Sequence, residues 1–314
     1  MVRQRTRIPL INIVIILLLV VLVFLVIMGY LLHWGWTGLS KRTLWDWLQL
    51  LIIPVVLAFG GYLINLTISR SEQEATKQRA QSEREAVEKR AEIERYIALD
   101  SQCEAALQGY FDKMSELLLE RSLRESQPED EVRTIARVRT LTTLSQIDAN
   151  RKKSVVQFLH ESSLILATNS SLQSKKTIKD KNIISLEDAD LDSADLTGSH
   201  LFLANLSHAY LRQANLAGAS LDMADLSRSY MTYANLRNAD LKEAVLVRAK
   251  MEFTNLIGAN LIRADLRDAD LRQADLSGAD LSGANLSRAK VTSEQLGQAK
   301  SLKDAIMPDG SKRP

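Results

Sequence analysis

Residues 263–286 read RADLRDADLRQADLSGADLSGANL, a stretch in which leucine returns every five residues. A five-residue step turns an α-helix by roughly 140°, so successive leucines would share no helix face. In a strand the side chains alternate, so an odd step would send neighbouring leucines to opposite faces. The spacing therefore indicates a chain that turns a corner after each pentapeptide.

The five-residue spacing extends from Leu186 to Val291. Of these 22 central positions 19 are Leu, and the other three are Met231, Met251 and Val291. The residue two before the centre is Ala in 18 of the 22 repeats, and the residue between them is Asp or Asn in 14. If four pentapeptides close a square coil, the central Leu and the Ala both point inward. Stacked coils then share backbone hydrogen bonds at a spacing of about 4.8 Å, and stacking provides the stability.

The tandem pattern A(D/N)Lxx over residues 184–291 resembles the pentapeptide-repeat family. This resemblance implies an all-β solenoid, a right-handed four-sided β-helix. The helix-like stretch TSEQLGQAK (292–300) and the residues after it resemble the C-terminal cap of such solenoids. We therefore expect residues 292–314 to form a cap and tail that cover the open end of the leucine column.

The first 68 residues have the composition of a membrane anchor. Ile13–Leu32 is a run of 20 residues without a charged or strongly polar side chain, and Leu48–Leu66 is a second run interrupted only by Gln49 and Asn65. Each run is long enough to cross ~30 Å of hydrocarbon. Residues 1–68 are therefore predicted to form a two-span transmembrane hairpin, with the lipid bilayer as a partner. Its aromatic anchors would be Trp34, Trp36, Trp45 and Trp47.

The charges around the two runs predict the topology. The loop between the runs contains Lys41 and Arg42, whereas more basic residues precede the first run and follow the second: Arg3, Arg5, Arg7, Arg70, Lys77, Arg79 and Arg84. Positive-inside counting places both termini in the cytoplasm. The stretches 44–65, 130–144 and 157–161 are similar to the anchor and helical portion of membrane-bound bacterial members of the family. The expected location is a bacterial plasma membrane or an internal membrane.

Residues 69–167 are predicted to form a helical stalk and bundle, followed by a linker over 168–183. Seven basic and seven acidic side chains alternate over 69–98, as in a solvated helix. An apolar stripe with a period of about 3.5 residues follows and must be buried, either in an intramolecular bundle or in a homo-oligomeric coil. It consists of Ile93, Tyr96, Cys103, Leu107, Tyr110, Met114 and Leu117.

Two further helices are expected after this stripe. Ser126 and Glu129 form a capping-box pattern, which predicts a helix from there to about Ser145. Another helix is expected from about Asn150 to Leu166.

The sequence contains no catalytic constellation. None of the four histidines has metal-ligand spacing with another ligand, and the Asp188–Asp192 segment lacks the glycine and the closing glutamate of a calcium loop. We expect no catalytic, cofactor-binding or metal-binding residues, and a protein that is not an enzyme. Residues spaced by multiples of twenty indicate a turn column on one side of the coil, and these are Gly198, Gly218, Asn238, Gly258 and Gly278.

The twenty-residue spacing also predicts a candidate interaction surface. Tyr210 and Tyr230 replace the usual Asp or Asn in successive coils, and Tyr233 and Phe253 stack on the same face. Arginines at the adjoining corner complete the candidate surface, which comprises Tyr210, Arg228, Tyr230, Tyr233, Arg248 and Phe253. Exposed aromatic residues flanked by arginines are typical of an interaction hot spot. The alternative is that the aromatic ladders only stabilise the stacked coils.

The favoured function is a membrane-anchored, non-enzymatic scaffold that displays the solenoid to an unknown cytoplasmic protein. Some members of the family mimic duplex DNA and act on topoisomerases, which is one alternative. Residues 185–291 contain 15 acidic and 11 basic side chains, too balanced for a strongly negative rod. A homo-oligomeric structural membrane protein, assembled through the helical stripe, is the other alternative. No nucleic-acid partner is expected, since the net charge is only +2.

Overall fold

The computed structural model describes residues 44–165 and 183–314, together with seven positions between 20 and 31. It divides into two compact units, Met1–Ile93 and Glu94–Pro314. The first predicted span (Ile13–Leu32), the loop between the two spans and the linker (168–183) lie mainly outside the described residues. The two-span hairpin therefore stays a prediction.

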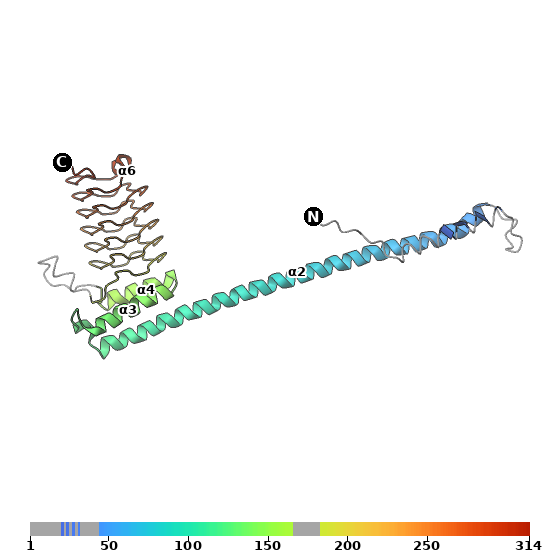
Figure 1. The fold of residues 1–314 in the computed structure, drawn as a ribbon, viewed down its shortest axis with the longest axis horizontal. Helices are drawn as coiled ribbons and strands as arrows, with labels where there is room; N and C mark the ends of the chain where they lie inside the picture. Colours follow the sequence, from blue (N-terminus) through green and yellow to red (C-terminus); the bar gives the residue numbers. More distant parts are fainter. Residues whose placement is uncertain (1–19, 22, 25–26, 29–30, 32–43, 166–182) are drawn as a thin grey trace. The chain divides into compact units, whose positions relative to one another are not determined.

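The first unit contains the N-terminal part of α2 (Leu44–Leu119), a continuous helix drawn in blue to green in Figure 1. An 18-residue window at the start of Ile52–Leu119 has a mean hydropathy of 1.9, and none of it is buried within the protein. Beyond it, residues 69–93 have exposed side chains and are rich in strong helix formers such as Glu, Lys, Arg and Ala. Within the described part of the chain, α2 is one helix long and apolar enough to cross a membrane.

The second unit begins with a small helical bundle. The end of α2 packs with α3 (Glu131–Gln146) and α4 (Ala149–Glu161), and the short 3-10 helix η2 (Leu123–Glu125) connects α2 to α3. The stripe residues from Leu107 onward, namely Leu107, Tyr110, Met114 and Leu117, are buried in this bundle. Ile93 and Tyr96, at the start of the stripe, are exposed. The stripe is thus covered within the chain from Leu107 onward.

Tyr110 shows how the bundle satisfies a buried polar group. Its hydroxyl lies 3.1 Å from the Thr140 hydroxyl, and its ring packs edge-on against Phe158 with centroids 5.9 Å apart. Burial raises the pKa of the Tyr110 hydroxyl, so the group stays a neutral hydrogen-bonding partner. The Cys103 thiol is half-buried and lies 3.6 Å from the Gln146 carbonyl oxygen.

Two predicted helix boundaries are wrong. The Ser126 hydroxyl donates to the Leu123 carbonyl at 2.6 Å and is not a helix cap, so α3 begins only at Glu131. Asp130, just before α3, instead accepts the Gln127 backbone N–H at 2.6 Å. Helix α4 ends at Glu161 and not near Leu166, because Ser163 adopts a left-handed φ of 58° that closes the last turn.

The solenoid occupies the rest of the unit, as stacked coils of twenty residues (Figure 1). Parallel bridges join each residue before a centre to its equivalent one coil later, from Asp190 with Tyr210 to Asp270 with Lys290. The central Leu and Met side chains from Leu186 to Leu286 are fully buried, and the alanines two residues earlier are nearly so. The predicted inward direction of Leu and Ala is confirmed.

Each corner of the coil is a tight turn. In one example the Ala214 N–H donates to the Leu211 carbonyl at 3.2 Å, and the third turn residue, Gln213, has a φ of 58°. Positive φ recurs at this position in the repeats from Asp188 to Arg288, on all four sides of the coil and mostly at residues other than glycine. The predicted glycine column is therefore only one of four turn columns. Within it, a Cβ at Gly258 would lie 2.4 Å from the Asn238 Oδ1 atom, so a larger residue there would require the Asn238 side chain to move.

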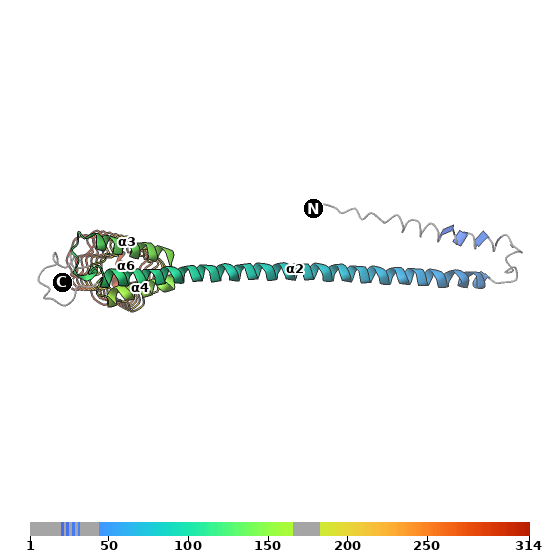
Figure 2. The same cartoon turned by 90° about the horizontal axis from the view of Figure 1, so that it is seen from below.

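The bundle covers the N-terminal end of the solenoid. Helices α3 and α4, drawn in green, lie next to the first coil in Figure 1, and seen from below they lie over the end of the stack (Figure 2). The Lys152 ammonium lies 2.9 Å from the Asp190 carboxylate, and Arg137 donates to the Glu187 carbonyl at 3.0 Å. The buried side chains of the bundle and of the solenoid form one continuous hydrophobic core.

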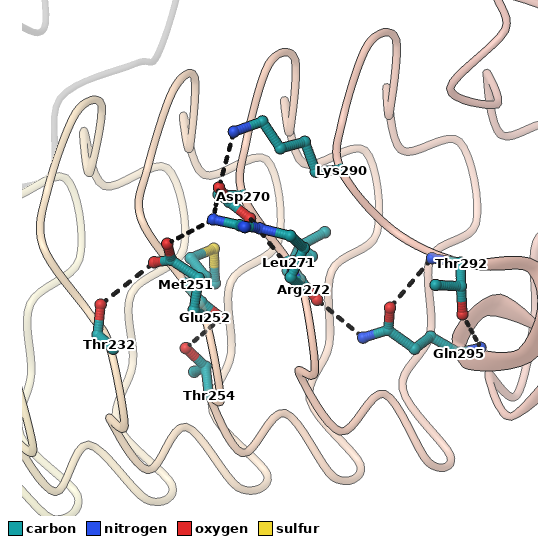
Figure 3. Close-up of polar contacts among 10 residues, drawn as sticks. All are labelled: Thr232, Met251, Glu252, Thr254, Asp270, Leu271, Arg272, Lys290, Thr292 and Gln295. Carbon is teal, nitrogen blue, oxygen red and sulfur yellow. Dashed lines mark hydrogen bonds and ion pairs between the residues drawn. The ribbon is translucent and has the colours of Figure 1, made fainter.

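The C-terminal end contains the expected short helix and then a further partial coil. A capping box between Thr292 and Gln295 starts α6 (Ser293–Gly297), and the Gln295 side chain donates to the Leu271 carbonyl at 2.8 Å (Figure 3). It also donates to the Ala274 carbonyl at 2.7 Å. The parallel ladder then resumes with an offset of 21 residues, pairing Asp280 with Ser301 and Asn285 with Ile306. The tail therefore adds a further partial coil, because α6 inserts only one extra residue.

Candidate functional site

The Asp or Asn before each central leucine makes a specific hydrogen bond. Its side-chain oxygen accepts the backbone N–H two residues later, as from Thr197 to Asp195 (3.1 Å) and from Ile257 to Asn255 (3.0 Å). Such side-chain to backbone bonds hold the start of each turn. The sequence pattern revealed the preference but not this bond. The same bond is made by Asp190, Asn205, Asn215, Asp225, Asn235, Asp240, Asn260, Asp265, Asp270, Asp275, Asp280 and Asn285.

On one face of the solenoid, this side-chain to backbone hydrogen bond is absent from three successive coils. Between Asp190 and Asp270, its column contains Tyr210, Tyr230 and Lys250, none of which has a side-chain acceptor that can replace the carboxylate or amide. A hydrogen bond of this kind contributes about 0.5–1.5 kcal/mol. The fold therefore loses several favourable contacts at these positions.

The aromatic side chains recover part of that stability by stacking. The Tyr210 and Tyr230 rings are 5.1 Å apart and nearly parallel at 5°, and the Tyr233 and Phe253 rings are 4.7 Å apart at 16°. The Lys250 ammonium lies 4.9 Å from the Tyr230 ring centroid. Each aromatic pair contributes about 0.5–1.5 kcal/mol beyond its buried area. In this column one aromatic pair stands in for three hydrogen bonds, so stacking offsets only part of the loss, and stability alone does not explain the replacement.

The corner positions of Tyr233 and Phe253 add a second unfavourable feature. Both residues have positive φ, 64° and 59°, which is strained for a bulky side chain and would suit glycine or asparagine better. Their side chains remain 57% and 44% exposed, and Tyr210 is 39% exposed. Large apolar surface is thus held in solvent, and two of its three residues, Tyr233 and Phe253, occupy the positive-φ corner that every repeat contains.

The six predicted surface residues lie on one face of the solenoid. Arg228 and Arg248 occupy one corner column, Tyr210 and Tyr230 the column beside it, and Tyr233 and Phe253 the opposite corner. Lys250 belongs to the same column as the two tyrosines and was missed, although the twenty-residue spacing places it there. We call these seven residues the aromatic–basic face.

The acidic side chains next to this face are engaged by other cations. Glu252 lies 3.1 Å from Arg272 and 3.3 Å from the Thr232 hydroxyl, whereas Arg272 and Lys290 both bind Asp270 (Figure 3). Arg288 binds Asp268 with two bonds, of 2.7 and 2.9 Å. Within residues 44–165 and 183–314, no ion pair closer than 4.0 Å involves Arg228, Arg248 or Lys250. The face therefore carries an excess of positive charge.

The core beneath the face also departs from the repeat. Met231 and Met251 replace leucine, and Ser229 and Thr254 replace alanine, yet all four are fully buried. The Thr254 hydroxyl bonds to the Met251 carbonyl at 2.7 Å (Figure 3), and the Ser229 hydroxyl donates to the Leu226 carbonyl at 2.7 Å. Both buried hydroxyls therefore have hydrogen-bond partners, and neither substitution leaves an unsatisfied polar group in the core.

The described residues show no arrangement suited to metal chemistry. No group of three or more His, Cys, Asp or Glu side chains within them has a geometry that could hold a metal ion. Asp190 and Asp192, from the segment that resembles a calcium loop, are bound by Lys152 and Arg212. His160 and His200 stack with centroids 4.9 Å apart beside a cavity of about 440 Å³, and burial lowers the pKa of His160.

Acid should weaken the solenoid next to this face. Hydrogen bonds from Arg272 and then Lys290 lower the pKa of Asp270 to about 2 from a model-compound value of 3.8. Because the folded-state pKa is the lower one, the stabilisation is complete above pH 3.8 and is lost as the pH falls toward 2. We expect protonation of Asp270 to lower the free energy of unfolding by about 2 kcal/mol. Urea unfolding followed by circular dichroism should show a pH slope over this range that shrinks in Asp270→Asn, and an unchanged slope would contradict the assignment.

The coils and their repeat define a β-solenoid repeat protein. Residues 184–218, 209–246, 224–262 and 249–288 match the family description "Pentapeptide repeats", with 8 copies. A crystal structure of alr5209, a pentapeptide repeat protein from Nostoc PCC 7120, shares 37% identity over 27% of this chain and 69% of that chain, with a TM-score of 0.26. The chain belongs to the pentapeptide-repeat family, and its solenoid is a right-handed β-helix.

Two further solved structures are similar to this chain. HetL from Nostoc sp. strain PCC 7120, described as involved in heterocyst differentiation regulation, shares 31% identity over 41% of this chain and 77% of its own, with a TM-score of 0.22. QnrB1, a plasmid-mediated fluoroquinolone resistance protein, shares 18% identity over 39% of this chain and 74% of its own, with a TM-score of 0.18. A search of curated proteins found no match to the chain.

Proposed function

We propose that the protein is a membrane-anchored, non-enzymatic scaffold whose solenoid presents the aromatic–basic face to a cytoplasmic protein partner. The observation that carries this proposal is the replacement of the usual Asp or Asn by Tyr210, Tyr230 and Lys250 in one column. Three successive coils replace a fold-stabilising hydrogen bond with side chains that leave apolar surface and charge in solvent. Exposed aromatic residues rimmed by cations match the composition of binding hot spots.

The anchor in this proposal is a two-pass hairpin with both termini in the cytoplasm. The apolar, unburied start of α2 supports one span, and the run Ile13–Leu32 would supply the other. The basic residues flanking the two runs support the orientation. A reporter fused after Pro314 that is active only in the cytoplasm should give signal, whereas activity of a reporter that works only outside would contradict this topology.

Ion pairing favours the scaffold over a DNA mimic. A mimic of duplex DNA needs uncompensated acidic columns, but Asp192, Asp265, Asp268 and Asp270 each have an arginine partner. The likeness to QnrB1, at 18% identity, carries no function to this chain. Burial of the helical stripe from Leu107 onward likewise weakens the homo-oligomeric alternative, since that part is already covered.

Affinity capture tests the proposal directly. Full-length protein in detergent should retain a protein partner that is lost in Tyr210→Ser/Tyr230→Ser/Tyr233→Ser/Phe253→Ser, because the hot spot is removed. The matched control, Arg237→Ser/Ile257→Ser/Ile262→Ser, changes side chains on other faces and should retain the partner. Far-UV circular dichroism would verify that both variants fold. Equal capture by the wild type and the aromatic variant would contradict the proposal.

A further inference from the structure

We infer that the aromatic–basic face binds an extended acidic segment of its protein partner, in which carboxylate and apolar side chains alternate. This inference rests on the proposed function and specifies the chemistry of the partner. It follows from three features of the face: its uncompensated charge, its exposed aromatic surface, and the order of its columns.

The charge of the face selects an anionic partner. Arg228, Arg248 and Lys250 are exposed, and their acidic neighbours are held by other cations. Asp268 is hydrogen-bonded by Arg288, which is the main reason that its pKa is lowered. Arg248 lowers that pKa only through its charge, without a hydrogen bond. Carboxylates on a partner would meet positive charge that the solenoid does not neutralise, and such complementarity steers association.

The aromatic columns select apolar side chains on the same partner. Tyr233 and Phe253 form one stacked pair at the corner opposite the arginines, and Tyr210 and Tyr230 form the other. Stacked rings are rigid and lose little conformational entropy when they are covered. A partner that offered only carboxylates would leave this apolar surface in water.

The order of the columns selects an extended conformation. The basic corner and the aromatic corner lie on two sides of one face, and both columns run along the stack of coils. Side chains of an extended segment alternate between two sides. A segment that follows the stack can therefore direct acidic side chains toward Arg228 and Arg248, and apolar ones toward Tyr233 and Phe253.

Other anionic macromolecules fit the face less well. Strong binding to duplex DNA rests on many phosphate contacts, commonly about 6–10, whereas the face supplies three cations, of which Lys250 already lies over the Tyr230 ring. An anionic membrane surface would use the charges but offers no defined partner for two ordered aromatic stacks. The combination of few cations with a large aromatic surface favours a polypeptide.

Selection of peptides on the intact protein tests this inference. Full-length protein in phosphatidylcholine nanodiscs is used to select from a displayed library of random 12-residue peptides, and the affinities of the enriched peptides are then measured. We expect enrichment of peptides that alternate Asp or Glu with Phe, Leu or Ile. Arg228→Gln/Arg248→Gln/Lys250→Gln should weaken them by about tenfold or more. The control Arg237→Gln/Lys242→Gln/Lys303→Gln, which removes three exposed cations elsewhere, should change their affinity less than about twofold.

The possible outcomes separate the inference from the proposed function. The inference of an acidic segment would be overturned if the enriched peptides were neutral or basic, or if Arg228→Gln/Arg248→Gln/Lys250→Gln left their affinity unchanged. If binding of those peptides still required the four aromatic residues, the proposed interface would stand. Failure of the library to enrich any peptide, or binding of phosphatidylserine vesicles or duplex DNA in its place, would also overturn it. If aromatic substitution left the capture of natural partners unchanged as well, the proposed function itself would fail.

Discussion

Replacing Leu236 with Ala is expected to lower the free energy of unfolding of the solenoid by about 3–5 kcal/mol. Leu236 is fully buried in a column of inward-facing central residues. The coils above and below are tied to its own coil by a backbone hydrogen bond at each step, such as Leu236 N–H to the Asn255 carbonyl at 2.7 Å. They cannot collapse into the cavity without breaking that ladder, so the loss should lie toward the upper end of the usual range.

The matched control is Met231→Leu, at the equivalent repeat position. It restores the common residue with little change in volume and should alter stability by less than about 1.5 kcal/mol. Urea unfolding of the full-length protein in detergent, followed by circular dichroism, compares both variants with the wild type. Equal stability of Leu236→Ala and Met231→Leu would contradict the packed leucine column.

Replacing Asp190 with Asn is expected to destabilise the junction between α4 and the first coil by about 1–3 kcal/mol. Lys152 is only 5% exposed, and its ammonium lies 2.9 Å from the Asp190 carboxylate. The substitution keeps a side-chain oxygen for the Asp192 N–H but removes the charge that compensates the lysine. A fully buried orphaned charge would cost about 3–5 kcal/mol, and the expected value is smaller because the Asp190 side chain is 44% exposed.

The double variant Lys152→Met/Asp190→Asn isolates the cause. If the loss comes from an uncompensated lysine, removing the lysine should recover most of the stability. Hydrogen exchange by mass spectrometry on the intact protein would follow the α4 and first-coil amides in each variant. Faster exchange in the double variant than in Asp190→Asn alone would show that Lys152 stabilises the junction by packing and not through this ion pair.

The repeat made the solenoid predictable because one simple rule governs its interior. Leucine at every fifth position and alanine two residues earlier place the same atoms at the same depth in each coil, so the sequence pattern predicts the core directly. The same twenty-residue arithmetic predicted that Tyr210 lies over Tyr230 and that Tyr233 lies over Phe253, and the ring distances agree.

Features that depend on the backbone or on distant contacts were not predictable in this way. Positive φ at Tyr233, Arg228 and other bulky residues follows from the requirement to turn at each corner, which overrides local preference. The wrong α3 start arose because Ser126 bonds backward to Leu123. The contact of Lys152 with Asp190 joins residues 38 apart in sequence, and no periodicity links them.

The measurement that most directly tests the role of the aromatic–basic face combines stability and capture in one variant, Tyr210→Asn/Tyr230→Asn/Lys250→Asn. It restores the common residue type and should regain three side-chain to backbone bonds, with stacking amides like the pair in which Asn235 donates to Asn215 at 2.9 Å. We predict that the hydrogen-exchange protection of the solenoid is retained or rises by up to about 3 kcal/mol, because three regained bonds outweigh one lost ring stack, while the partner is lost. Clearly weaker protection with the partner retained would contradict an interface and show that the aromatic columns serve the fold.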